Sequence, residues 1–335
     1  MRNIGRSALP LSLILLASLL VPSLSMAQED IGLDQQIKTI ADAHHGHVAL
    51  IAHDLKTGQT ASLLPDEPVP TASVIKMGIL LDAAEQIRAG QATFDERIVL
   101  TKANQVEGSG VLGELTPPIA LTLGDTLTLM VVLSDNTATN MAIDRLGLAH
   151  INETLRAAGL HQTVLYKKVY VPATGPMPPD QPKFGLGKTT PREMASIMER
   201  FATCRLALDG SAPRVGDGPI CGKILHMLRN QQTRDKLPRY LETLDTSENG
   251  SAIGNKTGEL NRVRNDVALI STKAGPVVIA AFTWDNEDQR WTGENEAEQM
   301  IGRLGKTIVD RWSPMGLDAS AFPWDNPLEA RTTTR

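Results

Sequence analysis

The sequence predicts an α+β fold, with one antiparallel sheet built from both chain ends and flanked by helices, plus an all-helical insert. Alternating or β-branched runs separated by turn residues occur at 47–64 and again at 251–284. Between them, apolar residues recur at helical spacing, interrupted by glycine and proline loops. Strands on both sides of a helical region are typical of an α+β architecture. We therefore expect one domain at 28–312, with an α/β part at about 28–90 and 249–312, a helical part at about 91–248, and an irregular tail at 313–335.

The first 27 residues predict a secretory signal peptide. Two arginines precede the apolar stretch ALPLSLILLASLLVPSL, and Ser25 and Ala27 offer small side chains at a cleavage site. A membrane anchor is the alternative, but Pro22 and the small residues favour cleavage before Gln28. We expect an exported protein, periplasmic or secreted, without a membrane association after cleavage. The chain has a formal net charge of −5 and no basic cluster, which argues against nucleic acid as a partner.

The elements follow one another in a readable order. A helix at 31–44 precedes a β-hairpin, in which HVALIAHD and TASLL flank a tight turn. The next helix contains Ser73 and ends at Gly90. Thr190 is an expected N-cap, with Pro191 at the first helical position. The other expected helices are 126–136, 138–147, 149–159, 190–208, 220–231 and about 295–312, and the later strands are 251–258, 264–272 and 276–284.

Two small groups of residues are candidates for a metal site or a disulfide crosslink. His44, His45 and His47 fall close together, but nothing nearby completes a ligand set with the usual spacing. Cationic side chains near a helix end at Gly46 are the favoured interpretation, so no metal or cofactor is expected. Cys204 and Cys221 are the only cysteines, and in an exported chain such a pair favours a disulfide over two buried thiols.

Three short motifs hold the residues of a nucleophilic site. Ser73-Val74-Ile75-Lys76 starts a helix, Ser134-Asp135-Asn136 ends one, and Lys256-Thr257-Gly258 ends a strand. A serine hydroxyl is a weak nucleophile until a base takes its proton, and Lys76 shares a helix face with Ser73. Lys76 must be neutral to act as that base, so burial and a second cation, Lys256, must lower its pKa.

The remaining roles follow from the same chemistry. Ser134 can bridge the two lysines and pass a proton to the leaving nitrogen. Asn136 offers an amide that can hold Lys76 and the acyl side chain of the substrate. The backbone N–H groups of Ser73, near a helix N-terminus, and of Glu259, just after the strand motif, would form the oxyanion hole.

Together and in this order, the motifs resemble those of the class A β-lactamase superfamily, the penicillin-recognising serine hydrolases. HDLKTGQ, VEGSGVL at 106–112 and TTPREMA resemble the same family, so the likeness covers most of the chain. The resemblance implies that Asn136, Thr257 and Gly258 contact the substrate. It also implies an arginine for the substrate carboxylate, either Arg264 or Arg262, which lies two residues away on the same strand face.

One segment departs from the family pattern. β-Lactamases of this family keep a glutamate in the middle loop, where it orients the water that hydrolyses the acyl-enzyme. Here residues 154–179 contain no Asp or Glu, and Val169 or Val171 stands where the glutamate is expected. Asp180 comes late, among prolines, and we do not assign it the role. His161, Tyr166 and Tyr170 are the nearby alternatives.

Three functions therefore compete. The first is a β-lactamase-type serine hydrolase that acylates on Ser73 and deacylates slowly. The second is a D,D-peptidase or transpeptidase of the penicillin-binding type, acting on peptides that end in D-Ala-D-Ala. The third is a penicillin-sensing or inactive binding module, which the intact set of reactive residues disfavours. In each case the partner is a small β-lactam or a D-Ala-D-Ala peptide, and fold alone does not decide between them.

Overall fold

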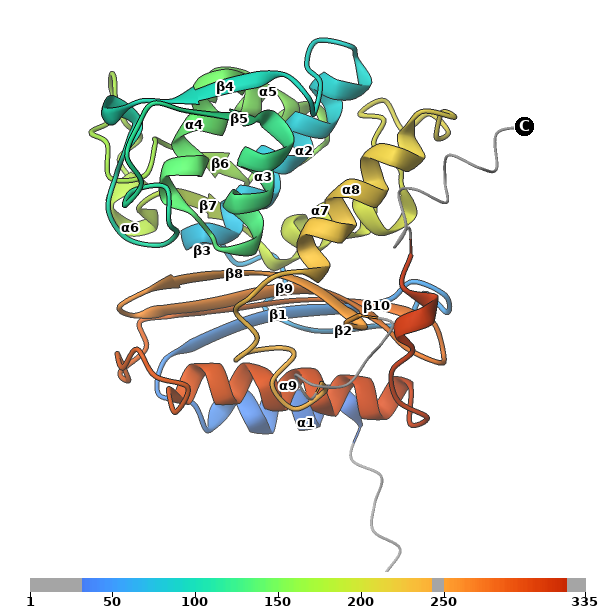
Figure 1. The fold of residues 1–335 in the computed structure, drawn as a ribbon. Helices are drawn as coiled ribbons and strands as arrows, with labels where there is room; N and C mark the ends of the chain where they lie inside the picture. The colour runs from blue at the N-terminus through green and yellow to red at the C-terminus, as the bar shows by residue number, and fades with distance from the viewer. Residues whose placement is uncertain (1–31, 243–249, 324–335) are drawn as a thin grey trace, which may run out of the picture. The chain divides into compact units, whose positions relative to one another are not determined.

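The computed structural model describes residues 32–242 and 250–323, and one antiparallel sheet of five strands forms the centre of this region. Its strand order is β2-β1-β10-β9-β8, so the N-terminal hairpin pairs with strands from the C-terminal part (Figure 1). The predicted α+β fold class is confirmed. The strands are β1 (His47–Asp54), β2 (Thr60–Leu63), β8 (Ile253–Leu260), β9 (Val263–Ser271) and β10 (Pro276–Trp284).

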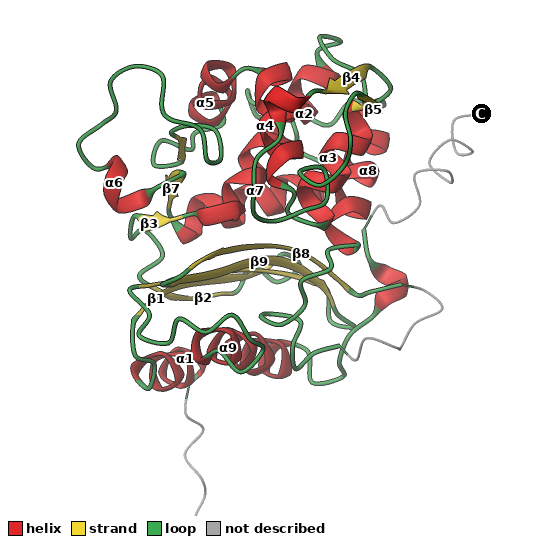
Figure 2. Cartoon of the chain, turned by 60° about the vertical axis from the view of Figure 1, so that its left-hand side comes forward, coloured by secondary structure: helices red, strands yellow, loops and turns green. Residues whose placement is uncertain are grey.

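Helices cover both faces of this sheet. Helices α1 (Leu33–Asp42) and α9 (Glu296–Trp312) pack together on one face, and the helical region covers the other (Figures 1 and 2). Strands β9 and β10 are therefore buried almost throughout, instead of alternating between buried and exposed residues. Two apolar cores result, one on each side of the sheet.

The insert is mainly helical, but it also contains short strands that the sequence did not predict. One small sheet pairs β4 with β5, and another has the order β3-β7-β6. Segments of two to four residues are too short for an alternating pattern to be recognised. These strands are β3 (Val69–Pro70), β4 (Arg97–Leu100), β5 (Ile119–Thr122), β6 (Val164–Leu165) and β7 (Gly187–Thr189).

The helices of the insert lie close to their expected positions. Helix α7 begins as predicted, because the Thr190 hydroxyl accepts the N–H of Glu193 and Pro191 occupies the first helical position. The Ser73 segment begins as a 3₁₀ turn before it becomes α-helical. The helical elements are η1 (Ala72–Ile75), α2 (Lys76–Arg88), η2 (Lys102–Asn104), α3 (Leu123–Val132), α4 (Asn136–Leu146), α5 (Leu148–Ala157), α6 (Gln181–Phe184), α7 (Pro191–Thr203) and α8 (Asp217–Arg229).

Cys204 and Cys221 form the predicted disulfide, with their Cα atoms 5.7 Å apart. The disulfide joins Cys204, the residue after α7, to Cys221 on α8. Helix α7 ends earlier than expected, at the point where Cys204 takes a left-handed backbone conformation with φ 52°. Beyond α9 the tail contains a short 3₁₀ turn, η3 (Ala319–Ala321).

The predicted leader and part of the predicted tail cannot be compared with the structure. The predicted leader, residues 1–27, lies outside the described residues, as does the end of the tail at 324–335. Among the helices in the described part of the chain, none is long and apolar enough to cross a bilayer.

Candidate active site

The Ser73 turn packs directly against the end of strand β8. A Cβ atom at Gly258 would lie 3.0 Å from the Ser73 nitrogen and 2.8 Å from the Val74 nitrogen, so only glycine allows this approach. Ala72, immediately before the serine, has a φ of 45°, an uncommon conformation for a residue with a side chain. The predicted nucleophile is thus held on a constrained turn beside the Lys256-Thr257-Gly258 motif.

Asn265 fixes this turn from the neighbouring strand β9. It lies opposite Gly258 in the β8–β9 register, and its side chain is fully buried. Its Nδ2 atom donates to the carbonyl oxygens of Pro70, at 2.8 Å, and Thr71, at 3.2 Å. Sequence reasoning missed this residue, because a single asparagine in a strand gives no sign of a partner almost 200 positions away.

Lys76 joins the first two motifs. Its side chain is fully buried, and its Nζ atom donates to the Ser134 carbonyl oxygen at 2.6 Å, to Ser134 Oγ at 3.1 Å and to Asn136 Oδ1 at 3.2 Å. Ser134 lies between α3 and α4 with a φ of 54°, and Asp135 caps α4 by accepting the N–H of Ala138 at 2.8 Å. The break between the two helices therefore turns the serine hydroxyl toward Lys76.

Lys256 reaches the same hydroxyl from strand β8. Its Nζ atom donates to Ser134 Oγ at 3.0 Å and to the Thr257 carbonyl oxygen at 2.7 Å. The Ser134 hydroxyl thus lies between two buried lysines that come from different parts of the chain. The structure thus brings Lys76, Ser134 and Lys256 together, and Ser73 lies one turn before Lys76.

The surroundings lower the pKa of both lysines. Burial lowers the pKa of Lys76 well below its ordinary value, and the nearby charge of Lys256 lowers it further, while Asp135 opposes both effects. Burial also lowers the pKa of Lys256, to about 7, against the opposing charges of Glu259 and Asp266. A buried amine that loses its proton near neutral pH can accept a proton from a hydroxyl group.

The loop at 106–112 closes over the second motif. Asn136 Nδ2 donates to the Glu107 carbonyl oxygen at 3.1 Å, and Asp135 Oδ2 accepts the N–H groups of Val111 and Leu112. Gly108 has a φ of 93°, and a Cβ atom there would lie 2.7 Å from Asn136 Nδ2. The oxygen atom of the Asn136 amide is therefore fixed by Lys76, and its nitrogen atom is fixed by this loop.

The middle loop is attached to α4 through Asn140. Asn140 Nδ2 donates to the Val169 carbonyl oxygen at 3.0 Å, and the Val169 N–H donates to Asn140 Oδ1 at 2.8 Å. Asn140 is four residues, or about one helical turn, after Asn136, so both amides lie on the same side of α4. Val169 is therefore held one turn from the residue that contacts Lys76. The spacing of the two asparagines was the only sequence signal for this contact.

Comparison with known proteins agrees with this geometry. The family model described as "Beta-lactamase enzyme family" matches residues 32–312. The chain belongs to this family.

Two curated relatives match over parts of their length. One is the β-lactamase regulatory protein BlaB of Streptomyces cacaoi, 27% identical over 127 residues, which cover 37% of this chain and 41% of BlaB. The other is the β-lactamase AER-1 of Aeromonas hydrophila, 24% identical over 169 residues, which cover 50% of this chain and 56% of AER-1. The chain thus spans about half the length of the curated relatives it matches.

Solved structures match most of the chain. A β-lactamase from Sphaerobacter thermophilus is 29% identical, with 84% of this chain and 96% of that chain covered and a TM-score of 0.69. A mutant of PBP-A in an acyl-enzyme complex with penicillin G is 25% identical, with 83% and 95% covered and a TM-score of 0.66. An ancestral class A β-lactamase is 22% identical, with 84% and 100% covered and a TM-score of 0.66, which supports the fold.

In this β-lactamase family member, neither arginine fits the expected carboxylate-binding role. Arg264 lies opposite Glu259 in the register, on the sheet face that α9 covers, and its buried Nε atom pairs with Glu298 Oε1 at 2.9 Å. Arg262 is exposed and donates to the carbonyl oxygens of Asp285 and Asn286. Both guanidinium groups are engaged away from Ser73, so we do not retain either as a substrate ligand.

The other residues considered from sequence also have defined positions. Asp180 pairs with Lys188 at 2.8 Å and accepts a hydrogen bond from the Tyr166 hydroxyl at 3.3 Å. It therefore connects residues near the beginning and the end of the middle loop. Burial raises the pKa of Tyr166, so its hydroxyl group keeps its proton at neutral pH and provides no phenolate base. In the histidine group, His44 contacts Glu296 and Asn286, and its nitrogens are thus engaged by α9 and the loop before it.

Proposed function

We propose that this chain opens β-lactams through an acyl-enzyme on Ser73 and that the acyl-enzyme is hydrolysed slowly. The observation that supports this function most strongly is the Ser134 hydroxyl, held between the Lys76 and Lys256 amines at 3.1 and 3.0 Å. Such an arrangement provides a base, a second cation and a proton carrier within one buried network. We further propose that the chain is exported and acts on its substrate outside the cytoplasm.

Acylation uses groups that are present. Ser73 Oγ attacks the lactam carbonyl carbon, and its proton passes to the neutral amine of Lys76. The carbonyl oxygen gains negative charge, which the backbone N–H groups of Ser73 and Glu259 stabilise. The C–N bond then breaks, and Ser134 protonates the leaving nitrogen and regains a proton from Lys76. In this proposal Asn136, Thr257 and Gly258 contact the substrate.

The deacylation step lacks a carboxylate in the middle loop, because residues 154–179 contain no Asp or Glu. We propose that Val169, held by Asn140 one turn from Asn136, occupies the position from which a carboxylate could activate water. General-base assistance is typically worth about 100- to 10,000-fold in rate. Its absence slows hydrolysis of the acyl-enzyme and leaves the acylation step with its full set of groups.

A second candidate function is a D,D-peptidase or transpeptidase that acts on peptides ending in D-Ala-D-Ala. The carboxylate-free middle loop favours it, because such an enzyme passes the acyl group to an amine or releases it slowly from β-lactams. A regulatory or sensing role is the third candidate, and the relative BlaB, named as a β-lactamase regulatory protein, is the reason to retain it.

One set of measurements separates these functions. The protein without residues 1–27 is mixed with a penicillin, and the acyl-enzyme is followed by intact mass while nitrocefin turnover is recorded. We expect one fast equivalent followed by slow turnover. Release of D-alanine from a D-Ala-D-Ala peptide, faster than nitrocefin hydrolysis, would favour the peptidase. Absence of any acyl-enzyme would overturn the proposed function.

A further inference from the structure

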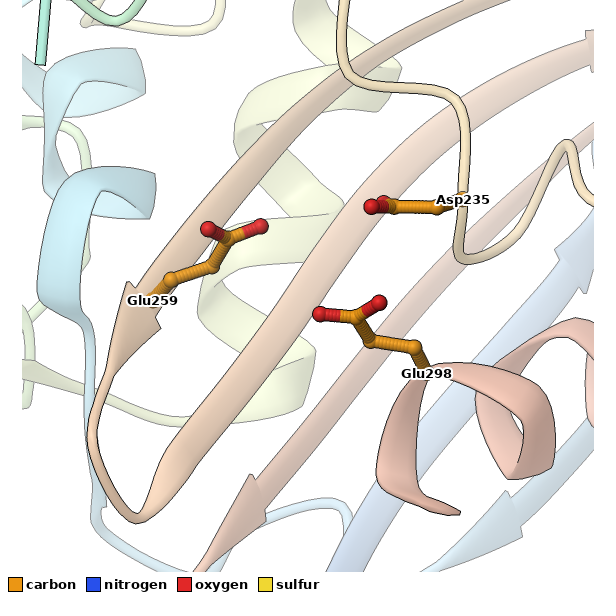
Figure 3. A group of neighbouring side chains, drawn as sticks. All are labelled: Asp235, Glu259 and Glu298. Carbon is orange, nitrogen blue, oxygen red and sulfur yellow. The ribbon is translucent and has the colours of Figure 1, made fainter. Parts of the chain in front are cut away.

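Near the end of strand β8, on the sheet face that α9 covers, three carboxylates from three separate elements point toward one another (Figure 3). They are Asp235, in the loop after α8, Glu259 on β8, and Glu298 on α9, and their oxygen atoms lie within 4.8 Å of one another. Among the described residues, this is the only group of acidic, histidine or cysteine side chains close enough to suggest a metal site. Three such carboxylates repel one another unless a cation lies between them.

The cation is supplied by the chain itself. The Lys236 ammonium is fully buried, lies 2.8 Å from Asp235 Oδ1 and 3.7 Å from Glu298 Oε1, and donates to Glu259 Oε1. Burial by itself lowers the pKa of Lys236, but the three carboxylates outweigh it and raise the pKa above its ordinary value. Lys236 is therefore charged at neutral pH and takes the place that a metal ion would need.

A second buried cation extends the cluster to the turn after β8. The Arg264 guanidinium pairs with Glu298 and also donates to the carbonyl oxygens of Leu260 and Val263. The last residues of β8 are thus attached to α9 through Arg264 and to the loop after α8 through Lys236. Both cations have no exposed side-chain surface, so these contacts are little weakened by water.

The position of Glu259 connects this cluster to the chemistry. Successive residues of a strand face opposite sides of the sheet. Gly258 faces the Ser73 turn, as its close approach to the Ser73 nitrogen shows, and Glu259 extends from the other face to Lys236. The backbone N–H of Glu259 is the proposed oxyanion donor, and its side chain is the part of the residue that Lys236 holds.

We propose that Lys236 is a positioning residue for acylation: by binding the Glu259 side chain, it fixes the end of β8 so that the Glu259 N–H stays aimed at the oxyanion. This inference rests on the proposed acyl-enzyme function. Loss of one oxyanion-hole donor typically costs about 100- to 1,000-fold in rate, and misplacement by about 1 Å can cost about 100-fold. Loosening the strand should therefore slow the chemical step and leave the binding of unreacted substrate nearly unchanged.

The test compares Lys236→Met with Lys236→Arg in the protein without residues 1–27. Acylation by a fluorescent penicillin is measured over a range of concentrations, which separates the rate constant of the chemical step from the affinity of the unreacted complex. We expect Lys236→Met to lower the rate constant about 10- to 100-fold with little change in affinity, and Lys236→Arg to retain it within about threefold. Because Lys236 also lowers the pKa of Lys256, the rate constants are compared at the plateau of each pH profile.

Affinity for phenylboronic acid gives an independent readout. Its tetrahedral adduct on a serine places an oxygen in the oxyanion hole, so its affinity should fall in parallel with the acylation rate in Lys236→Met. The control is Arg88→Met, which removes another nearly buried cation, paired with Asp217 at 3.1 Å at the end of α2 remote from Lys76. It should lower the melting temperature but leave the acylation rate constant of the folded protein unchanged.

The outcomes are distinguishable. A folded Lys236→Met variant that acylates and binds phenylboronic acid like the wild type overturns the proposal and leaves the proposed function intact. Failure of the wild type to acylate overturns the function itself. If Lys236→Met does not fold, Asp235→Asn removes one partner of Lys236 and should slow acylation by about three- to tenfold, and an unchanged rate in that variant also overturns the proposal.

Discussion

The Lys76–Ser134–Lys256 network and the middle loop both contact α4, but they are built in opposite ways. The network consists of buried polar groups from α2, from the segment between α3 and α4 and from β8, and the pKa values of its two lysines are lowered by burial and by nearby cations. The loop presents a valine, held through its backbone by Asn140, and its one acidic residue, Asp180, is used to fasten the loop. Under the proposed function, the groups needed for acylation thus adjoin a loop without a carboxylate base, which predicts that the two half-reactions differ greatly in rate.

The largest effect is expected from removing Ser73, the proposed nucleophile. Ser73→Ala should reduce covalent labelling by a fluorescent penicillin by about 10,000-fold or more, because Ser73 Oγ is the atom that attacks the carbonyl carbon in the proposed mechanism. Its melting temperature should stay close to that of the wild type. Ser62→Ala, an exposed serine on β2, is the control and should label normally. Labelling of the Ser73 variant at the wild-type rate would refute the assignment.

The difference between the two regions should shrink when the loop receives a carboxylate. Val169→Glu is expected to accelerate loss of the penicilloyl group by about 100-fold or more, since general-base assistance is typically worth about 100- to 10,000-fold. Val171→Glu, two residues beyond the segment that Asn140 holds, is the matched control and should change the rate little. Intact mass spectrometry during washout of penicillin measures both rates. Faster deacylation in the Val171 variant alone would show that the register inferred from Asn140 is wrong.

The disulfide should support the fold without contributing to either half-reaction. Replacing Cys204 and Cys221 together by alanine opens a loop of about 16 residues and should lower the free energy of unfolding by roughly 3 kcal/mol in the chain-entropy model. Urea denaturation measures the loss, and the acylation rate constant of the folded variant should equal that of the wild type. A large drop in acylation with little loss of stability would place the disulfide in the function of the site.

The smallest expected effect for each step of the measurement, per pH unit, concerns the charge of the network. Between pH 7, near the folded pKa of Lys256, and 10.5, its ordinary value, the unfolded chain binds a proton that the folded protein does not. Stability therefore rises with pH across this window, by up to about 1 kcal/mol per pH unit, and the lowered pKa of Lys76 acts in the same direction. Lys256→Met should flatten the rise, as measured by urea denaturation between pH 7 and 9.5. An equal slope in both proteins would mean that Lys256 is charged in the folded state.

The sequence predicted the parts of this molecule that depend on local pattern. The helices around Ser73 and Thr190 follow from apolar periodicity and capping, and the strands at both ends follow from β-branched runs between turns. The three motifs were found because each one occupies consecutive positions. Short strands such as β6 and β7 were missed, because their pairing depends on neighbours and not on their own residues.

The roles of single polar residues could not be predicted in this way. The family resemblance suggested Arg264 or Arg262 as a ligand of the substrate carboxylate, yet the hairpin register places Arg264 opposite Glu259 and on the face of α9. A shift of one residue along a strand reverses the face to which a side chain points. The same dependence on register hid Asn265 and the contact between Lys236 and Glu259.

By itself, the sequence determined the α+β fold class and the disulfide partners, and it named Ser73, Lys76, Ser134 and Lys256 as the candidate reactive groups. Only the tertiary structure decided in which direction the pKa values of the lysines shift, which cations are already paired, and which valine of the middle loop is held by Asn140. The physical reason is that pKa shifts and ion pairs depend on burial and on distances of a few ångströms between residues far apart in the chain. Local residue patterns record which side chains are present, and the packing of β8 against η1, α9 and the loop after α8 determines what they contact.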